Sequence, residues 1–335
     1  YNYIYMNFLI KKNKIFIAGS NGMVGSSISR LLNKKGFSST KNNLFEPKRE
    51  ELDLTDITKV RKWFSENKPD IVINAAGKVG GILANSKNPV QFLLDNMKIQ
   101  NNLIEASWEF GTKRFLFLGS SCIYPKFSEQ PIKEEFLLTS KLEETNQWYA
   151  IAKISGLKLC EAYRNQYDFD TISLMPTNLY GPRDNYDLKN CHVMAALIRK
   201  FYEAKKNNYG EVICWGTGKP LREFLYVEDF AEACIYLLEN WFPNKTLSKS
   251  NKNNQPINWL NVGSDFEISI KDLALLIAKT VGYKGKIIWD KTKPDGTPRK
   301  KLDTTLISNI GWNPKTNLET GIKKTLDSFS KEFED

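Results

Sequence analysis

From Lys14 onward, short runs of apolar residues alternate with longer segments in which apolar residues recur at helical spacing. A short, continuously apolar run is typical of a strand buried on both faces, and the longer period is typical of an amphipathic helix. The strand-like runs are KIFIAG, DIVINAA, KRFLFLGS and DTISLMPT. The helical segments between them are MVGSSISRLLNKKG, ITKVRKWFSEN, VQFLLDNMKIQNNLIEASWEF and the stretch from Trp148 to Asn165. This alternation predicts an α/β fold with a doubly wound parallel sheet.

The rhythm loosens after Pro182, where the loops become longer. The elements expected there are a helix beginning near His192, a strand EVICWG, a helix from Glu228 to Asn240, a strand NWLNVG and a helix from Ser269 to Val281. We therefore expect a second, smaller α/β lobe beside the main sheet.

Two polar or irregular segments carry no predicted function. The breaker-rich stretch PNKTLSKSNKNNQP, Pro243 to Pro256, predicts a surface loop. The opening YNYIYMNFLI is too short to span a bilayer and lacks the features of a secretory signal. We interpret it as a leader or an added remnant, with Met6 as a candidate native start.

Composition narrows the classes of function. The formal net charge is +10, but the lysines are scattered and form no basic stripe interleaved with aromatic residues, so we expect no nucleic-acid partner. The five cysteines are odd in number and show no CxxC spacing, which argues against a disulfide framework and against a metal site. We expect a cytoplasmic protein with no membrane association.

The sequence KIFIAGSNGMVGSSISRLL places three glycines, Gly19, Gly22 and Gly25, between a predicted strand and a predicted helix. Glycines at this point let the backbone turn tightly and approach a diphosphate, whose charge then lies at the helix N-terminus. A glycine-rich turn without a ligand is the alternative. Because strand, loop and helix all agree, we predict a Rossmann-like dinucleotide site.

Two signals near the end of the second strand point to different nicotinamide cofactors. Glu46 stands where an acidic residue could hold the ribose hydroxyls of NAD. Lys48 and Arg49 follow, and cations there favour the additional phosphate of NADP. Asp53 is a candidate for the adenine edge, although it could equally cap the helix that starts near Asp56.

A serine and a YxxxK motif suggest proton chemistry. Ser120 follows the strand KRFLFLGS, and Tyr149 and Lys153 stand four residues apart on a predicted helix, so they share one face. A nearby cation should lower the pKa of the tyrosine, and the serine hydroxyl could hold a carbonyl oxygen while the tyrosine exchanges its proton. An ordinary amphipathic helix is the alternative reading of the pair.

With these motifs in place, the chain resembles the extended short-chain dehydrogenase/reductases of the sugar-nucleotide branch. The resemblance extends in order from about Ile15 to Asp303 and is strongest to the epimerase/reductases that act on GDP-4-keto-6-deoxymannose. It rests on the strings NAAGKVGGILAN, LGSSCIYPK, WYAIAK, MPTNLYGPRDN, CHVMAALIRKF, WGTGKPLREFLYVED, NVGS and KPDGTPRKKLD.

The resemblance implies epimerisation of GDP-4-keto-6-deoxy-D-mannose at C3 and C5, followed by NADPH-dependent reduction at C4, in a homodimer. It implies a dinucleotide-binding domain of residues 11–182 and 223–264, and a substrate-binding lobe of residues 183–222 and 265–335. Cys122 and His192 match the family's base and acid for the epimerisations, and Ser120, Tyr149 and Lys153 match its reductive triad. Taken alone, a single histidine at a helix start is more often a cap than a catalyst.

Binding residues carry over by the same matches. For NADP(H) they are Gly19, Ser20, Asn21, Gly22, Met23, Val24, Gly25, Arg49, Asp53, Ala75, Ala76, Leu118, Gly119, Ser120, Ser121, Lys153, Pro176, Thr177, Asn178, Leu179 and His192. For the GDP-sugar they are Ser121, Lys200, Trp215, Arg222, Asp295 and Arg299.

The chain departs from the family's usual pattern at three places. Ser20 and Asn21 stand where a basic residue is common, which leaves Arg49 as the candidate ligand of the additional phosphate. Cys191 replaces a common serine beside the histidine, and Lys200 replaces a common arginine, which keeps the charge but loses the bidentate fork.

Two other functions stay open. The first is a nucleotide-sugar 4-epimerase or 4,6-dehydratase with tightly held NAD, although SSCIYPK lacks the acidic pair that we expect in a dehydratase. The second is a non-catalytic, basic Rossmann protein that binds RNA, which the presence of both Tyr149 and Lys153 disfavours.

Overall fold

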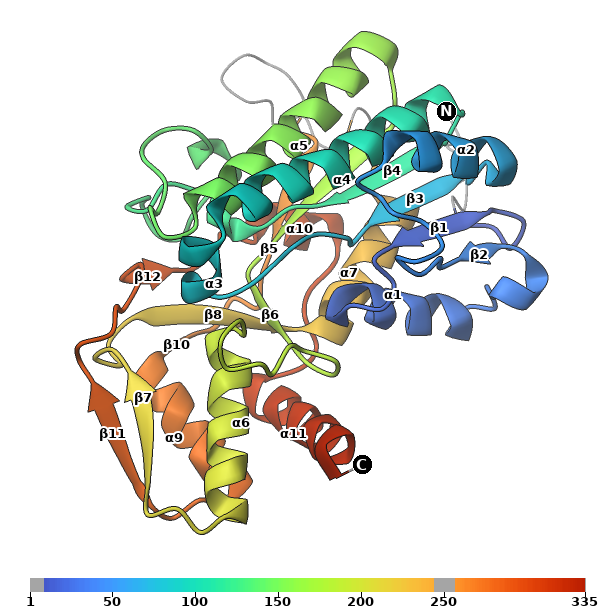
Figure 1. Cartoon of the computed structure of the whole chain (residues 1–335). Coiled ribbons are helices and arrows are strands. Elements are labelled where there is room, and N and C mark those ends of the chain that lie inside the picture. Colours follow the sequence, from blue (N-terminus) through green and yellow to red (C-terminus); the bar gives the residue numbers. More distant parts are fainter. Residues whose placement is uncertain (1–8, 244–256, 335) are drawn as a thin grey trace.

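The computed structural model describes residues 9–243 and 257–334. The predicted surface loop after Pro243 and residues 1–8 of the opening segment lie outside the described residues. The molecule is built on a parallel sheet of six strands, in the order β2-β1-β3-β4-β5-β9 (Figure 1). These strands are β2 (Leu44–Phe45), β1 (Ile15–Ala18), β3 (Ile71–Asn74), β4 (Arg114–Leu118), β5 (Thr171–Pro176) and β9 (Trp259–Val262).

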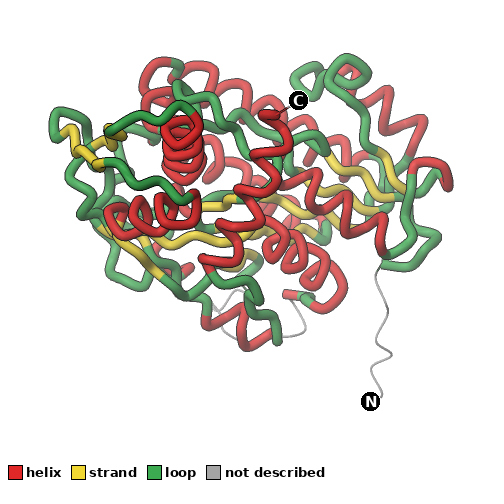
Figure 2. Tube along the Cα trace, turned by 90° about the horizontal axis from the view of Figure 1, so that it is seen from below, coloured by secondary structure: helices red, strands yellow, loops and turns green. Residues whose placement is uncertain are grey.

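Both faces of this sheet are buried because its strands are apolar on both sides. Ile15 and Ile17 belong to the core cluster on one face, whereas Phe16 and Ala18 belong to the cluster on the other. Helices therefore lie on both sides of the strands (Figure 2). One face is covered by α1 (Met23–Lys34), α7 (Val227–Asn240) and α10 (Thr305–Ile310), the other by α2 (Ile57–Asn67), α4 (Pro89–Glu109) and α5 (Gln147–Tyr167).

A smaller lobe packs below the sheet in the view of Figure 1. Its core includes Phe201, Ile277 and Phe329, one from each of three helices. The helices are α6 (Val193–Lys206), α9 (Ile270–Val281) and α11 (Leu318–Glu334). The strands outside the main sheet are β6 (Asn178–Tyr180), β8 (Leu221–Tyr226), β10 (Glu267–Ser269), β12 (Arg299–Lys300) and the parallel pair β7 (Glu211–Trp215) and β11 (Lys286–Asp290).

Glu223 of β8 is fully buried and joins three separate segments. Its carboxylate accepts hydrogen bonds from the backbone N–H groups of Ser264 (2.8 Å) and Leu302 (3.0 Å). Its backbone carbonyl accepts from Thr177 Oγ1 (3.1 Å) and Asn178 Nδ2 (2.8 Å), just beyond β5. A buried carboxylate with several donors is well satisfied, so this residue fixes how β8 meets the main sheet.

The strand order sets the place of the functional site. Because β2 and β3 lie on opposite sides of β1, a crevice opens at the carboxyl ends of β1 and β3, where ligands bind in doubly wound folds. The short helices α3 (Ile82–Lys87), η1 (Ser39–Lys41), η2 (Ser121–Ile123) and η3 (Glu134–Phe136) lie in the connections of the main sheet. The segments that carry the predicted motifs follow β1, β3, β4 and β5 at this edge.

The predicted fold class is confirmed, since a doubly wound parallel sheet is accompanied by a smaller α/β lobe. The pattern of apolar residues did not reveal β6, β8, β10, β11 and β12, which are short or contain charged residues. The residue boundaries of the two domains stay a prediction. Within the described ranges, no helix has the length and apolar character needed to cross a bilayer.

Candidate active site

The glycine loop forms a close-packed cradle between β1 and α1. Gly19 has φ of +83°, and a Cβ there would lie 2.8 Å from the backbone N and Cα of Ala76, beyond β3. A Cβ on Gly25 would overlap the carbonyl oxygen of Gly19. Gly22 is the N-cap of α1 and no side chain caps this helix, so its first N–H groups face the crevice without a side-chain acceptor. This arrangement fits a diphosphate at the helix N-terminus.

The residues proposed for the ribose and adenine lie at the end of β2. Arg49 is exposed, and Glu46 is partly exposed. Asp53 accepts hydrogen bonds from the backbone N (3.0 Å) and Oγ1 (2.7 Å) of Thr55, and these hydrogen bonds lower its pKa. Asp56, and not Asp53, caps α2, which settles the alternative reading of Asp53 as the helix cap.

The remaining predicted cofactor residues follow the neighbouring strands. Thr177 is buried, and it donates hydrogen bonds to the backbone carbonyls of Glu223 and Val262. Asn178 donates to the same carbonyl of Glu223. The others lie in the glycine loop, in the first turn of α1, at the ends of β3, β4 and β5, in η2 and in β6: Ser20, Asn21, Met23, Val24, Ala75, Leu118, Gly119, Ser121, Pro176 and Leu179.

The structure brings Ser120, Tyr149 and Lys153 together. Tyr149 and Lys153 lie one turn apart on α5, and the Lys153 Nζ is 5.8 Å from the centroid of the tyrosine ring. The same Nζ donates a hydrogen bond of 2.8 Å to the carbonyl of Leu118, at the end of β4. The Ser120 side chain hydrogen bonds to Tyr149.

The prediction that Lys153 lowers the pKa of Tyr149 is wrong. Burial raises the pKa of Tyr149 and the nearby Cys122 raises it further, outweighing the hydrogen bond from Ser120. The Lys153 ammonium is directed to Leu118, and burial lowers its own pKa to about 8. Tyr149 is therefore a protonated phenol at neutral pH, the form needed to give a proton.

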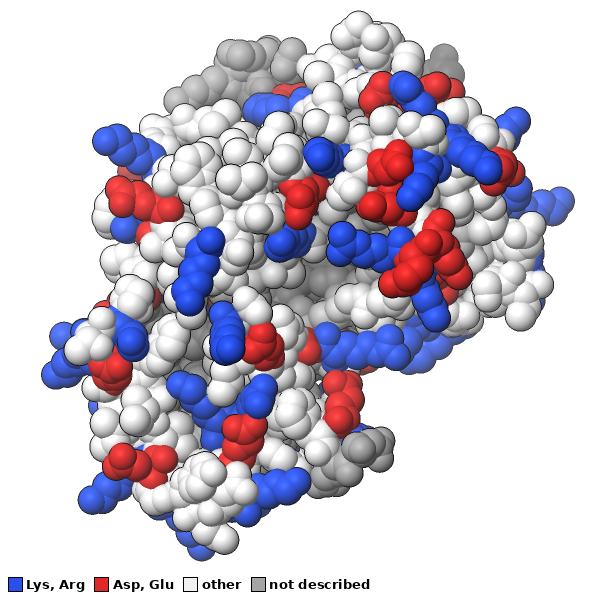
Figure 3. Space-filling view, in the orientation of Figure 1, with Lys and Arg blue, Asp and Glu red and all other residues white. Residues whose placement is uncertain are grey.

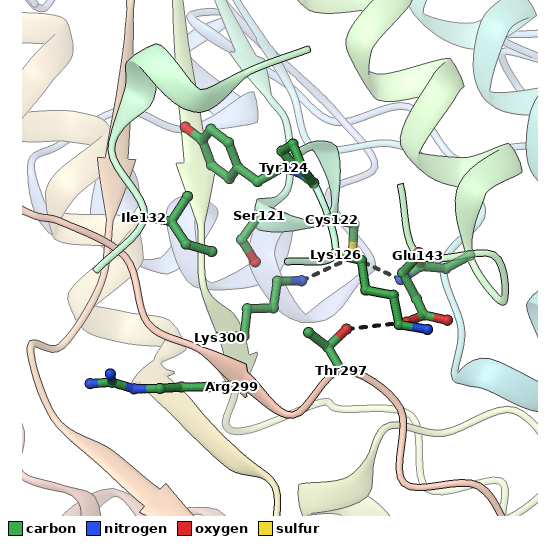
Figure 4. A pocket seen from close by; sticks show the side chains of 11 residues that line it. Ser121, Cys122, Tyr124, Lys126, Ile132, Glu143, Thr297, Arg299 and Lys300 are labelled. Carbon is green, nitrogen blue, oxygen red and sulfur yellow. Dashed lines mark hydrogen bonds and ion pairs between the residues drawn. The ribbon is translucent and has the colours of Figure 1, made fainter. Parts of the chain in front are cut away.

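Cys122 lies in η2, two residues after Ser120, and two donors contact its sulfur. Asn146 Nδ2 lies 3.3 Å from Sγ, and Lys300 Nζ lies 3.4 Å from it. Figure 4 shows the Lys300 side chain directed at this sulfur. A cation and an amide donor both stabilise a thiolate, which is the basic form of cysteine.

His192 is the N-cap residue of α6, but its side chain makes no cap hydrogen bond. His192 is exposed, and desolvation of its imidazole by the surrounding protein, together with the positive charge of Lys300, lowers its pKa. The loop before α3 contacts the segment that precedes His192, because the Gly81 N–H donates a hydrogen bond to the carbonyl of Asn190 at 2.9 Å. The neighbouring Cys191 is a neutral thiol, since burial and the negative charge of Asp184 raise its pKa to about 11.

A hollow lies between the two lobes and is bordered by Lys and Arg side chains (Figure 3). Arg222 donates to the carbonyls of Leu221 (2.9 Å) and Asp295 (3.5 Å), and burial lowers its pKa against the opposing charges of Cys122 and Asp295. Ser121 is buried beside Cys122. The Asp295 carboxylate accepts from Thr217 N (2.7 Å) and Oγ1 (2.8 Å).

Two predicted substrate residues form a second group at the end of β7. Trp215 is 46% exposed, so its ring is accessible to a ligand. Lys200 Nζ lies 5.7 Å from this ring and donates to the carbonyl of Ile213. Arg299 is placed differently, because its guanidinium pairs with Glu267 (Nε to Oε2, 2.8 Å) and points away from Cys122 (Figure 4).

The sequence did not single out several residues that surround the thiol. Lys300 and Asn146 bind its sulfur, and Glu143 lies on the same cavity. Lys300 lies in the string KPDGTPRKKLD, which states no role for it, and Glu143 and Asn146 lie in none of the strings that carry the resemblance.

Three comparisons with known proteins bear on this site. The family model "NAD dependent epimerase/dehydratase family" matches residues 15–247. The chain is 50% identical to GDP-L-fucose synthase 1 of Arabidopsis thaliana over 96% of this chain and 94% of that protein, and 46% identical to GDP-L-fucose synthase of Escherichia coli (strain K12) over 96% and 97%. A crystal structure of a GDP-L-fucose synthetase from Naegleria fowleri bound to NADP is similar, with a TM-score of 0.85, 28% identity and coverage of 97% of this chain and 95% of that one.

Proposed function

The chain belongs to the NAD dependent epimerase/dehydratase family, and on that basis we propose that it converts GDP-4-keto-6-deoxy-D-mannose to GDP-L-fucose. The reaction inverts C3 and C5 and then reduces C4 with NADPH. The observation that carries this proposal is the joining of two sets of groups in one site. The Ser120–Tyr149–Lys153 triad suits the reduction of a ketone. Cys122 and His192 suit proton exchange, and Lys300 links them, because it contacts the Cys122 sulfur and its charge acts on His192.

The cradle formed by Gly19 and Gly25 fits the diphosphate of the cofactor, and the exposed Arg49 suits the additional phosphate of NADP. When bound, the nicotinamide supplies the hydride to C4. NADP also occupies the related Naegleria fowleri enzyme. The buried ammonium of Lys153, at the end of β4, then binds the cofactor.

The epimerisations use the acidity of the hydrogens beside the 4-keto group. The Cys122 thiolate removes the proton from C3 or C5, and the electron pair moves into the enediolate. His192 then gives a proton to the same carbon from the other face, which inverts the centre. Lys300 and Asn146 stabilise the thiolate before the step.

The reduction uses the neighbouring triad. Ser120 holds the C4 oxygen, and Tyr149 donates its proton to that oxygen as the alkoxide forms. The raised pKa of Tyr149 keeps this proton in place at neutral pH until it is needed. Arg222 and the Trp215 ring bind the diphosphate and the guanine side of the substrate.

The test follows deuterium and hydride separately. The protein is incubated with GDP-4-keto-6-deoxy-D-mannose in D₂O, and we expect faster oxidation of NADPH than of NADH and deuterium at C3 and C5. Cys122→Ser should suppress deuterium entry, whereas Tyr149→Phe should keep deuterium entry and lose reduction. Cys191→Ser is the matched control and should behave like the wild type, because that thiol is neutral. Wild-type behaviour of both Cys122→Ser and Tyr149→Phe would contradict the assignment.

We also propose a homodimer formed through α4 and α5. These two long helices lie side by side on one face of the sheet (Figure 1). They expose Val90 (62%), Leu94 (45%), Trp148 (39%) and Ile151 (38%), apolar surface that a second copy of the chain can cover. Light scattering after gel filtration should give twice the chain mass, and Leu94→Glu should give a monomer. A wild-type monomer at micromolar concentration contradicts the proposal.

A further inference from the structure

A small cavity lies beside the Cys122 sulfur, on the side of the strand β12 (Figure 4). Its volume is about 20 Å³, which accommodates roughly one water molecule. Besides Cys122, the polar residues that line it are Ser121, Tyr124, Lys126, Glu143, Asn146, Thr297, Arg299 and Lys300. The cavity therefore connects the thiol with a carboxylate through a space that suits one water.

The proposed reaction requires the base to act twice, and the following inference rests on that proposed function. Each inversion leaves Cys122 as a thiol and His192 without its proton. His192 is exposed and can recover a proton from solvent. Cys122 is half-buried, and in the proposed reaction its sulfur faces the substrate carbon, so its proton needs another way out before the second inversion.

Glu143 is the carboxylate on this route. Its side chain is 11% exposed, and its Oε2 lies 3.0 Å from Lys126 Nζ and 3.4 Å from Thr297 Oγ1. Its Oε1 accepts from the backbone N and Oγ1 of Thr145 at 3.3 Å each. Burial opposes the charge of Glu143, but the hydrogen bonds from Lys126 and Thr145 outweigh it and lower its pKa. The carboxylate is therefore ionised at neutral pH and carries no proton of its own.

We propose that Glu143 resets Cys122 between the two inversions by accepting its proton through one water molecule in the cavity. The S–H bond breaks and its electron pair stays on sulfur. The proton joins the water as one of the water's own protons forms an O–H bond with Glu143. The thiolate that results is held by Lys300 and Asn146, and Glu143 then gives its proton to bulk water.

The experiment measures the two inversions separately in a single turnover. Enzyme, GDP-4-keto-6-deoxy-D-mannose and NADPH are mixed in D₂O, quenched over time, and the products are sorted by NMR into those inverted at one centre and at both. Glu143→Gln keeps the size and the hydrogen-bonding oxygen of the side chain. We expect the first inversion at the wild-type rate and the second about 100-fold slower, so that singly inverted product accumulates. Glu143→Asp should restore part of the second rate.

Two control variants separate proton transfer from a structural role. Glu144→Gln removes the adjacent exposed carboxylate, which is outside the cavity wall, and should match the wild type. Lys126→Met removes the ion-pair partner but keeps the Glu143 carboxylate, so singly inverted product should not accumulate. The proposal is overturned if Glu143→Gln keeps the wild-type ratio of products, or if Lys126→Met shows the same accumulation. If the wild type inverts neither centre, it is the proposed function that fails.

Discussion

The contact between Gly81 and the segment before His192 leads to a sharp prediction for Gly81→Ala. A Cβ at residue 81 would lie 2.5 Å from the carbonyl oxygen of Cys191. A carbon–oxygen contact normally requires about 3.3 Å, so one side must move by roughly 0.8 Å. Gly81 is held by Asn85, whose Nδ2 donates to its carbonyl at 3.1 Å. We therefore expect the Cys191 carbonyl to move, and the adjoining His192 with it.

The expected effect is on proton transfer and not on hydride transfer. A displacement near 1 Å of a reacting group costs on the order of 100-fold in rate. With GDP-4-keto-6-deoxy-D-mannose and oxidised NADP in D₂O, deuterium entry at C3 and C5 should fall by about that factor. With NADPH, reduction should continue and give product without inversion, because Tyr149 and Lys153 lie on α5.

The control for this variant is Gly210→Ala, since a Cβ at residue 210 meets no atom within 4 Å. It should leave both rates unchanged. The reasoning is refuted if Gly81→Ala exchanges deuterium at the wild-type rate, or if reduction falls as far as exchange does. The second result would mean that the whole site, and not His192, had moved.

Three further predictions concern charge. The rate of hydride transfer should fall as pH rises through about 8, because Lys153, whose pKa burial lowers to about 8, loses its charge there; a rate that stays flat to pH 10 contradicts this. Lys300→Met should raise the pKa of His192, because the lysine cation lowers it; the chain has one histidine, so a single imidazole NMR signal reports the shift. Asp170→Asn should lower the free energy of unfolding by about 3 kcal/mol in urea titration, because the fully buried Arg114, 2.7 Å away, loses its carboxylate; an unchanged midpoint would show that the ion pair adds nothing.

Much of the main sheet could be predicted because its strands are apolar throughout and alternate with amphipathic helices. The small lobe was harder to read. The strand β8, LREFLY, has charged residues at its second and third positions, and it buries Glu223 in a hydrogen-bond network. No periodicity marks such a strand, and its partners β6, β10 and β12 are two or three residues long.

The candidate site shows a similar division. Gly19 and the YxxxK motif are local signals with a physical reason, so the residues alone point to them. Cys122 and His192 needed the resemblance, because a thiol and an imidazole on distant segments carry no shared pattern. Lys300 reaches Cys122 across 178 positions of the chain, and its neighbour Arg299 turns the other way to meet Glu267. Only the fold decides which of two adjacent cations enters the site.

The buried Glu223 links the two halves of the proposed chemistry through one residue. Its carbonyl holds Asn178, at the nicotinamide end, and its carboxylate holds Leu302, two positions beyond Lys300. The groups for hydride transfer and those for inversion are therefore tied to a common frame. A sugar bound once can pass through three changes at three carbons without being released, so the proposed keto intermediates stay in the site between steps. The linkage through Glu223 therefore allows one binding event to serve all three steps.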